Sequence, residues 1–257
     1  MSMEWYYADG IISGSSKVDA SGAKLFIPSK GAKEQHDFAD YLTMLNPTKA
    51  KAKITITFFW EDEEPTEFKT EIPAQSHQTL PLHTLKEKIV TRNKVYGTRI
   101  SSNVPIVVQP TRGEFEPGNP VTNAMASVVA HPGPLSSKET EWYYADGIVI
   151  AREDHPLVES EWISILNPNE DKEAHIVITF FLTTRKSSKY ECTVQSNRVR
   201  TIKIDDLKFI PKNEFYGVRV TSDMPVVVQE TRRAYQKGNP VPRSMFSVLA
   251  RPLHLPE

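Results

Sequence analysis

The side chains best suited to recognise a ligand stand together at the end of one hydrophobic segment. The segment from Pro105 to Arg112 ends in Gln109, Thr111 and Arg112. A guanidinium offers planar donors, and an amide and a hydroxyl each donate and accept, so these groups could bind a polar small molecule. By strand alternation Gln109 and Thr111 point away from Arg112. We therefore expect all three to meet one ligand only at a sheet end or a subunit boundary.

The same segment returns later in the chain, and each copy is preceded by an acidic residue. The repeated trio is Gln229, Thr231 and Arg232, and the acidic residues are Asp40 and Glu161. An arginine in a hydrophobic strand needs partners if it is buried. Two interpretations stay open for each arginine: a ligand contact, or an internal ion pair with the acidic residue of its own copy.

Aromatic residues near each copy's start add a second set of candidates. The stretch Glu4 to Gly10 returns unchanged as Glu141 to Gly147, and it places Trp5 and Trp142 at equivalent positions. Aromatic faces beside a few polar groups are typical of pockets for sugars and small metabolites. The alternative is that both tryptophans belong to the hydrophobic core, where most tryptophan surface is buried.

Catalytic and metal-binding patterns are not found. None of the seven histidines has a histidine counterpart in the other copy, and Cys192 is the only cysteine. No nucleophile elbow, phosphate loop or dinucleotide fingerprint is present. Glu4, Asp9 and Asp40 could flank a glycosidic bond, or they could be ordinary edge and turn carboxylates. We expect no enzyme activity, no catalytic residue, no metal and no cofactor.

Composition indicates a soluble globular protein. Hydrophobic residues make up 39% and charged residues 25%, and the net charge is −1. A basic excess, which usually accompanies nucleic-acid binding, is missing. The sequence shows no signal peptide and no apolar run long enough to cross a bilayer, and a single cysteine excludes an intrachain disulfide. We expect a cytoplasmic protein without nucleic-acid or membrane partners.

Repeated motifs divide the chain into two similar units. We expect domains at residues 1–133 and 140–257, joined by a linker at about 134–139 within the stretch His131 to Thr140, which contains two prolines, a glycine and two serines. The number of residues that separates equivalent motifs of the two copies decreases at a single point along the chain, so the first copy carries extra residues in one place. They fall within about 11–39 and predict an elaborated loop.

Hydrophobic periodicity predicts strands. Ile54, Ile56 and Phe58 alternate with polar residues, and short runs of this kind are separated by turn signals. The β-branched run Ile106 to Val108 predicts a strand covered on both sides. The range Leu80 to Ile89 is the best candidate for a helical turn. The fold class is therefore all-β, as two tandem antiparallel β-sandwiches similar to jelly rolls.

The order of these motifs resembles the sensory rhodopsin transducer family. The first copy supplies Trp5, Asp40, Leu45-Asn46, Ile54-Thr55-Ile56 and Ser102 to Arg112. The second copy supplies Trp142, Glu161, Leu166-Asn167, Ile176-Val177-Ile178, Asp206-Leu207 and Ser222 to Arg232. The chain departs from the family's pattern by fusing two units and by having His83-Thr84-Leu85 where an Asp-Leu turn is expected.

The resemblance implies an oligomerising jelly-roll sandwich that acts as a soluble sensor of small molecules, sugars among them. A dimer presenting four sandwiches follows if the fused chain also self-associates. The expected ligand residues are the ten named above: Trp5, Asp40, Gln109, Thr111, Arg112, Trp142, Glu161, Gln229, Thr231 and Arg232. Three hypotheses for the function stay open. The first is a sensor or signal transducer, the second is an adaptor that acts on a protein signalling partner, and the third is a carbohydrate-active enzyme.

Overall fold

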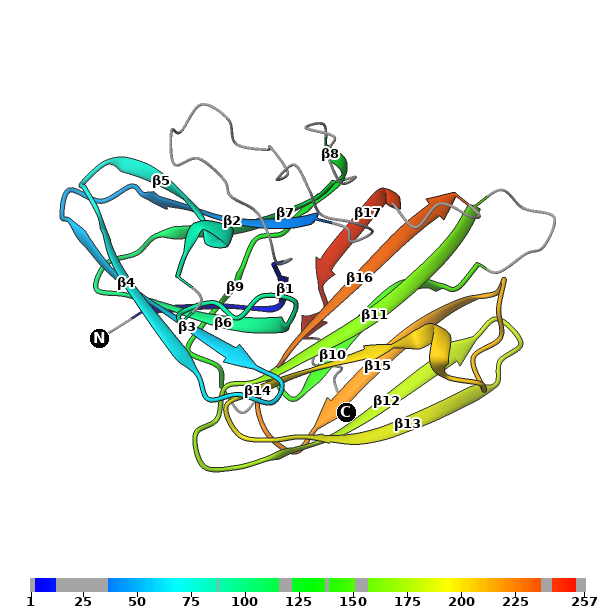
Figure 1. Ribbon diagram of the computed structural model, residues 1–257. Coiled ribbons are helices and arrows are strands. Elements are labelled where there is room, and N and C mark those ends of the chain that lie inside the picture. Colours follow the sequence, from blue (N-terminus) through cyan, green and yellow to red (C-terminus); the bar gives the residue numbers. More distant parts are fainter. Residues whose placement is uncertain are drawn as a thin grey trace.

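Two β-sandwiches follow one another along the chain, each built from a five-stranded and a four-stranded antiparallel sheet (Figure 1). The computed structural model describes residues 3–12, 37–86, 88–115, 122–136, 139–150, 157–236 and 242–252. The predicted all-β fold with two tandem sandwiches is therefore confirmed.

The first sandwich contains strands β1 to β9. They are β1 (Met3–Ile11), β2 (Asp37–Asn46), β3 (Ala52–Trp60), β4 (Thr66–Ile72), β5 (Ser76–Pro81), β6 (Val95–Ser102), β7 (Val107–Phe115), β8 (Thr122–Ser127) and β9 (His131–Pro132). The five-stranded sheet has the order β4-β3-β6-β1-β9, and the four-stranded sheet has the order β5-β2-β7-β8.

The second sandwich repeats this arrangement. Its strands are β10 (Glu141–Ile148), β11 (Leu157–Asn167), β12 (Ala174–Leu182), β13 (Ser187–Val194), β14 (Arg198–Lys203), β15 (Phe215–Ser222), β16 (Val227–Gln236), β17 (Pro242–Leu249) and β18 (Arg251–Pro252). The sheet orders are β13-β12-β15-β10-β18 and β14-β11-β16-β17, so the two sandwiches share one topology.

The core of each sandwich lies between its two sheets, on the faces that alternation predicts. Ile54, Ile56 and Phe58 of β3 are 2% exposed or less, and they belong to one buried cluster. Tyr7 of β1 and Leu42 of β2 join this cluster from neighbouring strands. The second sandwich has its own equivalent cluster.

A buried asparagine ends the second long strand of each sandwich. Asn46 is fully buried, and its Nδ2 donates hydrogen bonds to the carbonyls of Ala50 (2.8 Å) and Pro73 (2.9 Å). Asn167 makes the same kind of contact, donating to the carbonyls of Lys172 and Gln195. The Asn-Pro pair therefore begins a turn, and the asparagine amide holds two loops together.

The repeated Ala-Asp-Gly motif forms a β-bulge. In β1 the register with β6 shifts between Tyr7 and Gly10, so Ala8 and Asp9 leave the ladder. A Cβ added at Gly10 would lie 2.1 Å from the ring of Tyr96, which explains the glycine. The same shift in β10 leaves Ala145 and Asp146 out of register.

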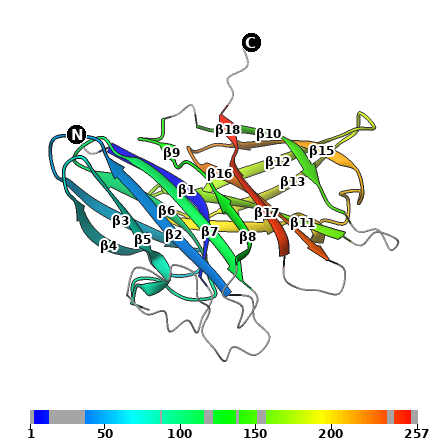
Figure 2. The ribbon, with the colours of Figure 1, turned by 90° about the horizontal axis from the view of Figure 1, so that it is seen from above.

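The two sandwiches pack through unlike faces. Strands β1 and β16 lie against each other, as do β8 and β17 (Figure 2). Tyr6, Ala8 and Phe59, on the outer face of the first sandwich's five-stranded sheet, form a buried cluster with Leu166 and Val227 of the second sandwich's four-stranded sheet. This contact is therefore head-to-tail, not symmetric.

Three expectations are modified or lie outside the described residues. Val107 is 47% exposed, so the predicted cover on both sides of its strand is wrong, whereas the equivalent Val227 is fully buried by the first sandwich. Leu82–Thr84 form a short 3-10 turn within the range expected to be helical. Most of the extra loop predicted at 11–39 lies outside the described residues. Among the described residues no helix is long and apolar enough to cross a membrane.

Candidate functional site

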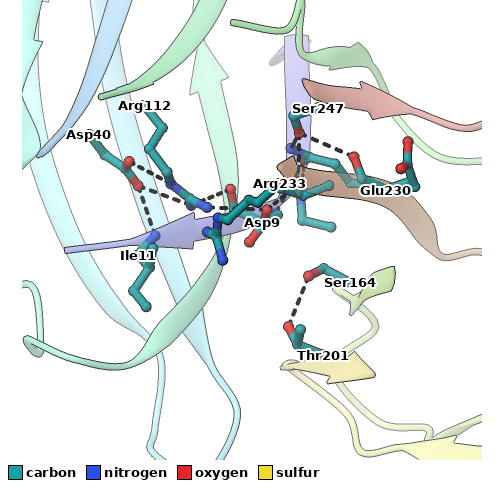
Figure 3. A network of polar contacts seen from close by, with 12 residues as sticks. Asp9, Ile11, Asp40, Arg112, Ser164, Thr201, Glu230, Arg233 and Ser247 are labelled. Atoms are coloured by element: carbon teal, nitrogen blue, oxygen red, sulfur yellow. Dashed lines mark hydrogen bonds and ion pairs between the residues drawn. The ribbon is translucent and has the colours of Figure 1, made fainter. Parts of the chain in front are cut away.

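The strongest polar cluster lies in the first sandwich, where Arg112 joins two carboxylates. Arg112 on β7 is the cross-strand neighbour of Asp40 on β2. Its Nε donates to Asp40 Oδ1 at 3.0 Å, its Nη1 lies 3.3 Å from Asp9 Oδ2, and its Nη2 donates to the Asp9 carbonyl at 2.8 Å (Figure 3). The bulge in β1 brings Asp9 into this cluster. Of the two interpretations of Arg112, the structure shows the internal ion pair.

This cluster has little capacity left for a ligand. Asp40 Oδ2 also accepts hydrogen bonds from the Tyr96 hydroxyl (2.7 Å) and the Ile11 amide (2.8 Å). Burial alone would raise the pKa of Asp9, but the nearby Arg112 guanidinium outweighs it and the pKa is lowered. The side chains of Arg112, Asp9 and Asp40 are each 8% exposed or less.

The predicted aromatic platforms face the cores. Trp5 is half-buried and packs against the core of the first sandwich. Trp142 is fully buried in the second core, and its Nε1 donates to the Glu139 carbonyl at 3.2 Å. Both tryptophans therefore fit the core alternative.

Gln229 and Thr231 hold the two sandwiches together. Gln229 Oε1 accepts hydrogen bonds from the bulged amides of Ala8 (3.0 Å) and Asp9 (3.2 Å). The Thr231 hydroxyl donates to Asp9 Oδ2 at 2.5 Å. Gln229 and Thr231 therefore lie at a boundary between the two sandwiches, within the chain.

The equivalent Gln109 is exposed, and Thr111 is half-buried. Both bind the Ser127 hydroxyl, at 2.7 Å and 2.8 Å. Gln229 and Thr231 bind Ser247 in the same way, both at 2.9 Å. The first sandwich thus carries the same polar arrangement, with nothing in the described chain covering Gln109.

In the second sandwich the counterpart of Arg112 is more loosely held. Arg232 forms ion pairs with Asp146 (3.0 Å) and Glu159 (3.7 Å), and the side chain of Asp146 is 64% exposed. Glu161, the predicted partner of Arg232, instead accepts hydrogen bonds from the Tyr144 hydroxyl at 2.8 Å and the Ile148 amide at 3.0 Å.

A buried acid distinguishes the second sandwich further. Glu230 replaces Pro110 of the first copy and is 1% exposed, and neither carboxyl oxygen has a hydrogen-bond partner among the described residues. Burial, with the Glu161 charge nearby, raises the pKa of Glu230 to about 9. Burial also raises the pKa of Glu161 to about 7. At neutral pH Glu230 is therefore a protonated acid that can both donate and accept.

Glu230 lies on the wall of a hollow of about 610 Å³. Aromatic side chains form much of its remaining lining: Tyr143, Tyr144, Phe181 and Phe246. The equivalent opening of the first sandwich is a cavity of only about 20 Å³. It is reduced by Arg112 and its partners and is lined partly by Thr231 and Met245 of the second sandwich.

Sequence reasoning missed Glu230 because it followed what the two copies retain. The sequence does contain a signal for Glu230, which is a difference between the copies: the first copy has Pro110 at this position of an otherwise repeated motif. Asp9 was considered only as a carboxylate that could meet Asp40. The structure brings those two together through Arg112.

The fold and these sites define a tandem β-sandwich protein with one locked polar cluster and one open hollow. A family model described as Anabaena sensory rhodopsin transducer matches residues 4–132 and again residues 137–247. The chain belongs to this family, with two copies of its unit in tandem, and membership indicates a role in signal transduction.

Solved structures give similar but weaker matches. One, titled "Crystal Structure of Thermotoga maritima 1070", is 23% identical with a TM-score of 0.36, covering 50% of this chain and 91% of that chain. Another, "Anabaena sensory rhodopsin transducer", is 28% identical with a TM-score of 0.32, covering 35% and 85%. No curated protein matches the chain. Because both TM-scores are low, the family assignment rests on the sequence match.

Proposed function

We propose that this chain is a signal-transducing sensor whose second sandwich binds a small, uncharged, hydroxyl-bearing molecule in the hollow beside Glu230. The observation that carries the proposal is the buried Glu230, which forms part of the wall of an open hollow and whose carboxyl oxygens have no hydrogen-bond partner in the described chain. A buried polar group without a partner is costly, and a ligand hydroxyl would satisfy it.

The lining of the hollow supports this ligand class. A protonated carboxyl can donate one hydrogen bond and accept others, as a sugar hydroxyl requires. Tyr143, Phe181 and Phe246 add apolar ring faces, on which the C–H surface of a sugar could lie. The hollow is lined by one acidic and one basic side chain besides Glu230, Asp146 and Arg251, so it carries no excess charge that would select an ion.

The same groups favour recognition over hydrolysis. Retaining and inverting glycosidases need a carboxylate free to act as nucleophile or base. Asp146 is ion-paired with Arg232, and the pKa of Glu230 lies above neutrality. In the first sandwich Asp9 and Asp40 are both held by Arg112.

A thermal-shift screen of monosaccharides, polyols and simple amides at millimolar concentration tests the proposal. We expect at least one compound to raise the melting temperature of the wild-type chain and of Phe209→Ala, which changes an exposed ring outside the hollow. The shift should disappear in Glu230→Leu. A panel without any hit, or a shift that Glu230→Leu retains, would contradict the proposal.

A second candidate is an adaptor that acts on another protein without a small ligand. It is favoured by the buried pairing of Arg112 with Asp9 and Asp40, which leaves a cavity of only about 20 Å³ at that position. The family description names sensory rhodopsin, so a membrane receptor of the rhodopsin class is the partner this candidate predicts. Binding to sensory rhodopsin in nanodiscs, with empty nanodiscs as control, tests it. No binding at about 100 μM receptor would count against this candidate.

A further inference from the structure

Strands β16 and β17 form a wall with a different site on each side. On one side Glu230 of β16, with Phe246 and Val248 of β17, lines the hollow of the second sandwich. On the other side Thr231 and Ser247 line the small cavity at the boundary with the first sandwich. Successive side chains of a strand point to opposite faces, so only the thickness of one sheet separates the two sites.

The outer face of β16 binds the first sandwich along most of its length. Every second residue takes part, and these residues are Val227, Gln229, Thr231 and Arg233. Val227 packs in the apolar cluster with Ala8, and Arg233 forms an ion pair with Glu114 of β7 at 2.5 Å. A movement of β16 relative to the first sandwich would therefore disturb all four contacts.

Hydrogen bonds of Ser247 connect the two faces of the wall. Its hydroxyl donates to the main-chain carbonyl of Glu230 at 3.2 Å (Figure 3). It also accepts a hydrogen bond from Gln229 Nε2 at 2.9 Å and lies 2.9 Å from the Thr231 hydroxyl. Thr231 in turn donates to Asp9. A continuous chain of hydrogen bonds therefore runs from the main chain of Glu230 to the Asp9 carboxylate of the first sandwich.

Charges on the two sides of the wall also interact. Burial raises the pKa of Glu230 to about 9, the Glu161 charge adds to this effect, and the Asp9 charge acts in the same direction. Burial would also raise the pKa of Asp9, but the Arg112 guanidinium lowers it, so Asp9 is ionised at neutral pH. An ionised Glu230 would therefore repel the carboxylate that Thr231 holds at the boundary.

The other charged and titratable groups around Glu230 belong to the second sandwich. They come from β10, β11, β15, β16 and β18, and they are Tyr144, Asp146, Glu161, Tyr216, Arg232 and Arg251. The part of β17 opposite Glu230 contributes Phe246 and Val248, which are apolar. Asp9 comes from the first sandwich, so it is the group through which the charge of Glu230 acts on the contact.

The first sandwich provides an internal comparison. Gln109 and Thr111 bind Ser127 as Gln229 and Thr231 bind Ser247. Pro110 takes the place of Glu230, however, so this wall has the same outer groups without the acid. Substitutions at Gln109 and Thr111 are therefore matched controls for substitutions at Gln229 and Thr231.

We propose that the wall of β16 and β17 couples the hollow to the contact between the two sandwiches. A protonated Glu230 favours the contact at Asp9, and an ionised Glu230 weakens it. By linkage, weakening the contact makes Glu230 easier to ionise. A ligand that accepts a hydrogen bond from protonated Glu230 would tighten the contact and so pass its binding to the first sandwich. This last step rests on the proposed function, whereas the coupling of the proton to the contact does not.

Nuclear magnetic resonance of the ligand-free chain between pH 7 and pH 10 tests the coupling, with the proton as the probe. The ¹³C resonance of the Glu230 carboxyl reports its ionisation, and the Ala8 methyl group reports the contact. We expect the Ala8 resonance to shift with the same midpoint as Glu230. The nuclear Overhauser effects that join Ala8 to Leu166 and Val227, in the same buried cluster, should weaken as pH rises. Neither change should occur in Glu230→Gln.

The reverse direction is tested from the outer face of the wall. Gln229→Leu removes the acceptor of the Ala8 and Asp9 amides, and it should increase the ionisation constant of Glu230 about fivefold, the lower end for coupled sites. Gln109→Leu, the matched change in the first sandwich, should leave that constant unchanged. Thr231→Val, with Thr111→Val as its control, makes the same test if Gln229→Leu does not fold.

An Ala8 methyl group that does not respond while Glu230 ionises would overturn the proposal, as would an Ala8 step that persists in Glu230→Gln. An unchanged ionisation constant of Glu230 in Gln229→Leu and Thr231→Val would also overturn it, as would a Glu230 carboxyl already ionised at pH 7. If the thermal-shift panel gives no hit but Ala8 follows Glu230, only the proposed function fails. If a compound binds beside Glu230 and Ala8 does not respond to pH, only the coupling fails.

Discussion

Arg112 and Arg232 end the same repeated segment but have opposite environments. Arg112 is 7% exposed and lies between two buried carboxylates, whereas Arg232 is 17% exposed and pairs with the largely exposed Asp146. The first cluster is covered by the neighbouring sandwich, through Thr231 bound to Asp9, and the second is not. The two arginines end the same repeated motif, so the motif alone does not determine their environment. The difference is that a neighbouring sandwich covers the Arg112 cluster, which is buried and fully ion-paired, whereas the Arg232 cluster is uncovered and lies at the edge of a hollow.

The largest predicted effect separates the two arginines. Arg112→Met leaves Asp9 and Asp40 buried without their cation, and removing one partner of a buried pair costs about 3–5 kcal/mol. Arg232→Met should cost about 1 kcal/mol or less, because its carboxylate partner is solvated. Chemical denaturation of both variants measures the difference. Equal losses would show that the two clusters are energetically alike despite their burial.

A smaller effect separates the two glycines. Gly97→Ala forces a methyl group against Leu166, and overpacking of this kind costs about 1–3 kcal/mol. Gly217→Ala should leave the free energy of unfolding almost unchanged, because an added Cβ there would meet only the Tyr144 carbonyl oxygen, at 3.7 Å. A loss of monomer stability in Gly217→Ala would mean that this position is constrained from within the chain.

The smallest effect concerns pH. Glu230 and Glu161 have pKa values of about 9 and about 7 in the folded chain, above the ordinary value of 4.5. Between pH 4.5 and these values the folded chain holds protons that the unfolded chain has lost, so their contribution to stability falls as pH rises. The slope is at most about 1.4 kcal/mol per pH unit for each proton.

Glu230→Gln removes the larger of these two contributions. Between pH 6 and pH 7 the wild type should lose about 1.4 kcal/mol more stability than Glu230→Gln, measured by denaturation at each pH. Glu71→Gln is the matched control, because its exposed carboxyl has a pKa lowered by the hydrogen bond from Lys51 and titrates below this range. If Glu230→Gln follows the wild-type pH dependence, Glu230 is ionised throughout.

Local features were predictable because local pattern determines them. Alternation of apolar and polar residues predicted that Ile54, Ile56 and Phe58 share one face, and that face is buried. The ion pair of Arg112 with Asp40 was one of the two stated alternatives. The direct cross-strand pairing of Arg112 and Asp40 follows from the register of β2 and β7. Features of this kind can be predicted from strand periodicity and from the presence of an opposite charge on the neighbouring strand.

Features that depend on how the sandwiches meet were not predictable. The exposure of Val107 and the burial of Val227 arise from packing between sandwiches, although the two valines have the same local sequence. Asp9 reaches Arg112 because of a bulge that ends at Gly10, where a Cβ would clash with the ring of Tyr96. Glu230 could have been noticed as a charged residue within a hydrophobic strand, opposite a proline in the other copy.

The bulge at Ala8 and Asp9 has a consequence for how this protein would respond to mutational scanning. The groups that Gln229 binds there are main-chain amides, which every residue except proline carries. Replacing Ala8 by another small residue leaves the recognised atoms in place, so a side-chain scan would score the position as unimportant. Ala8→Pro would remove one of the two donors while changing little side-chain volume. Part of the contact between the two sandwiches is thus made by main-chain atoms, which most amino-acid substitutions leave unchanged.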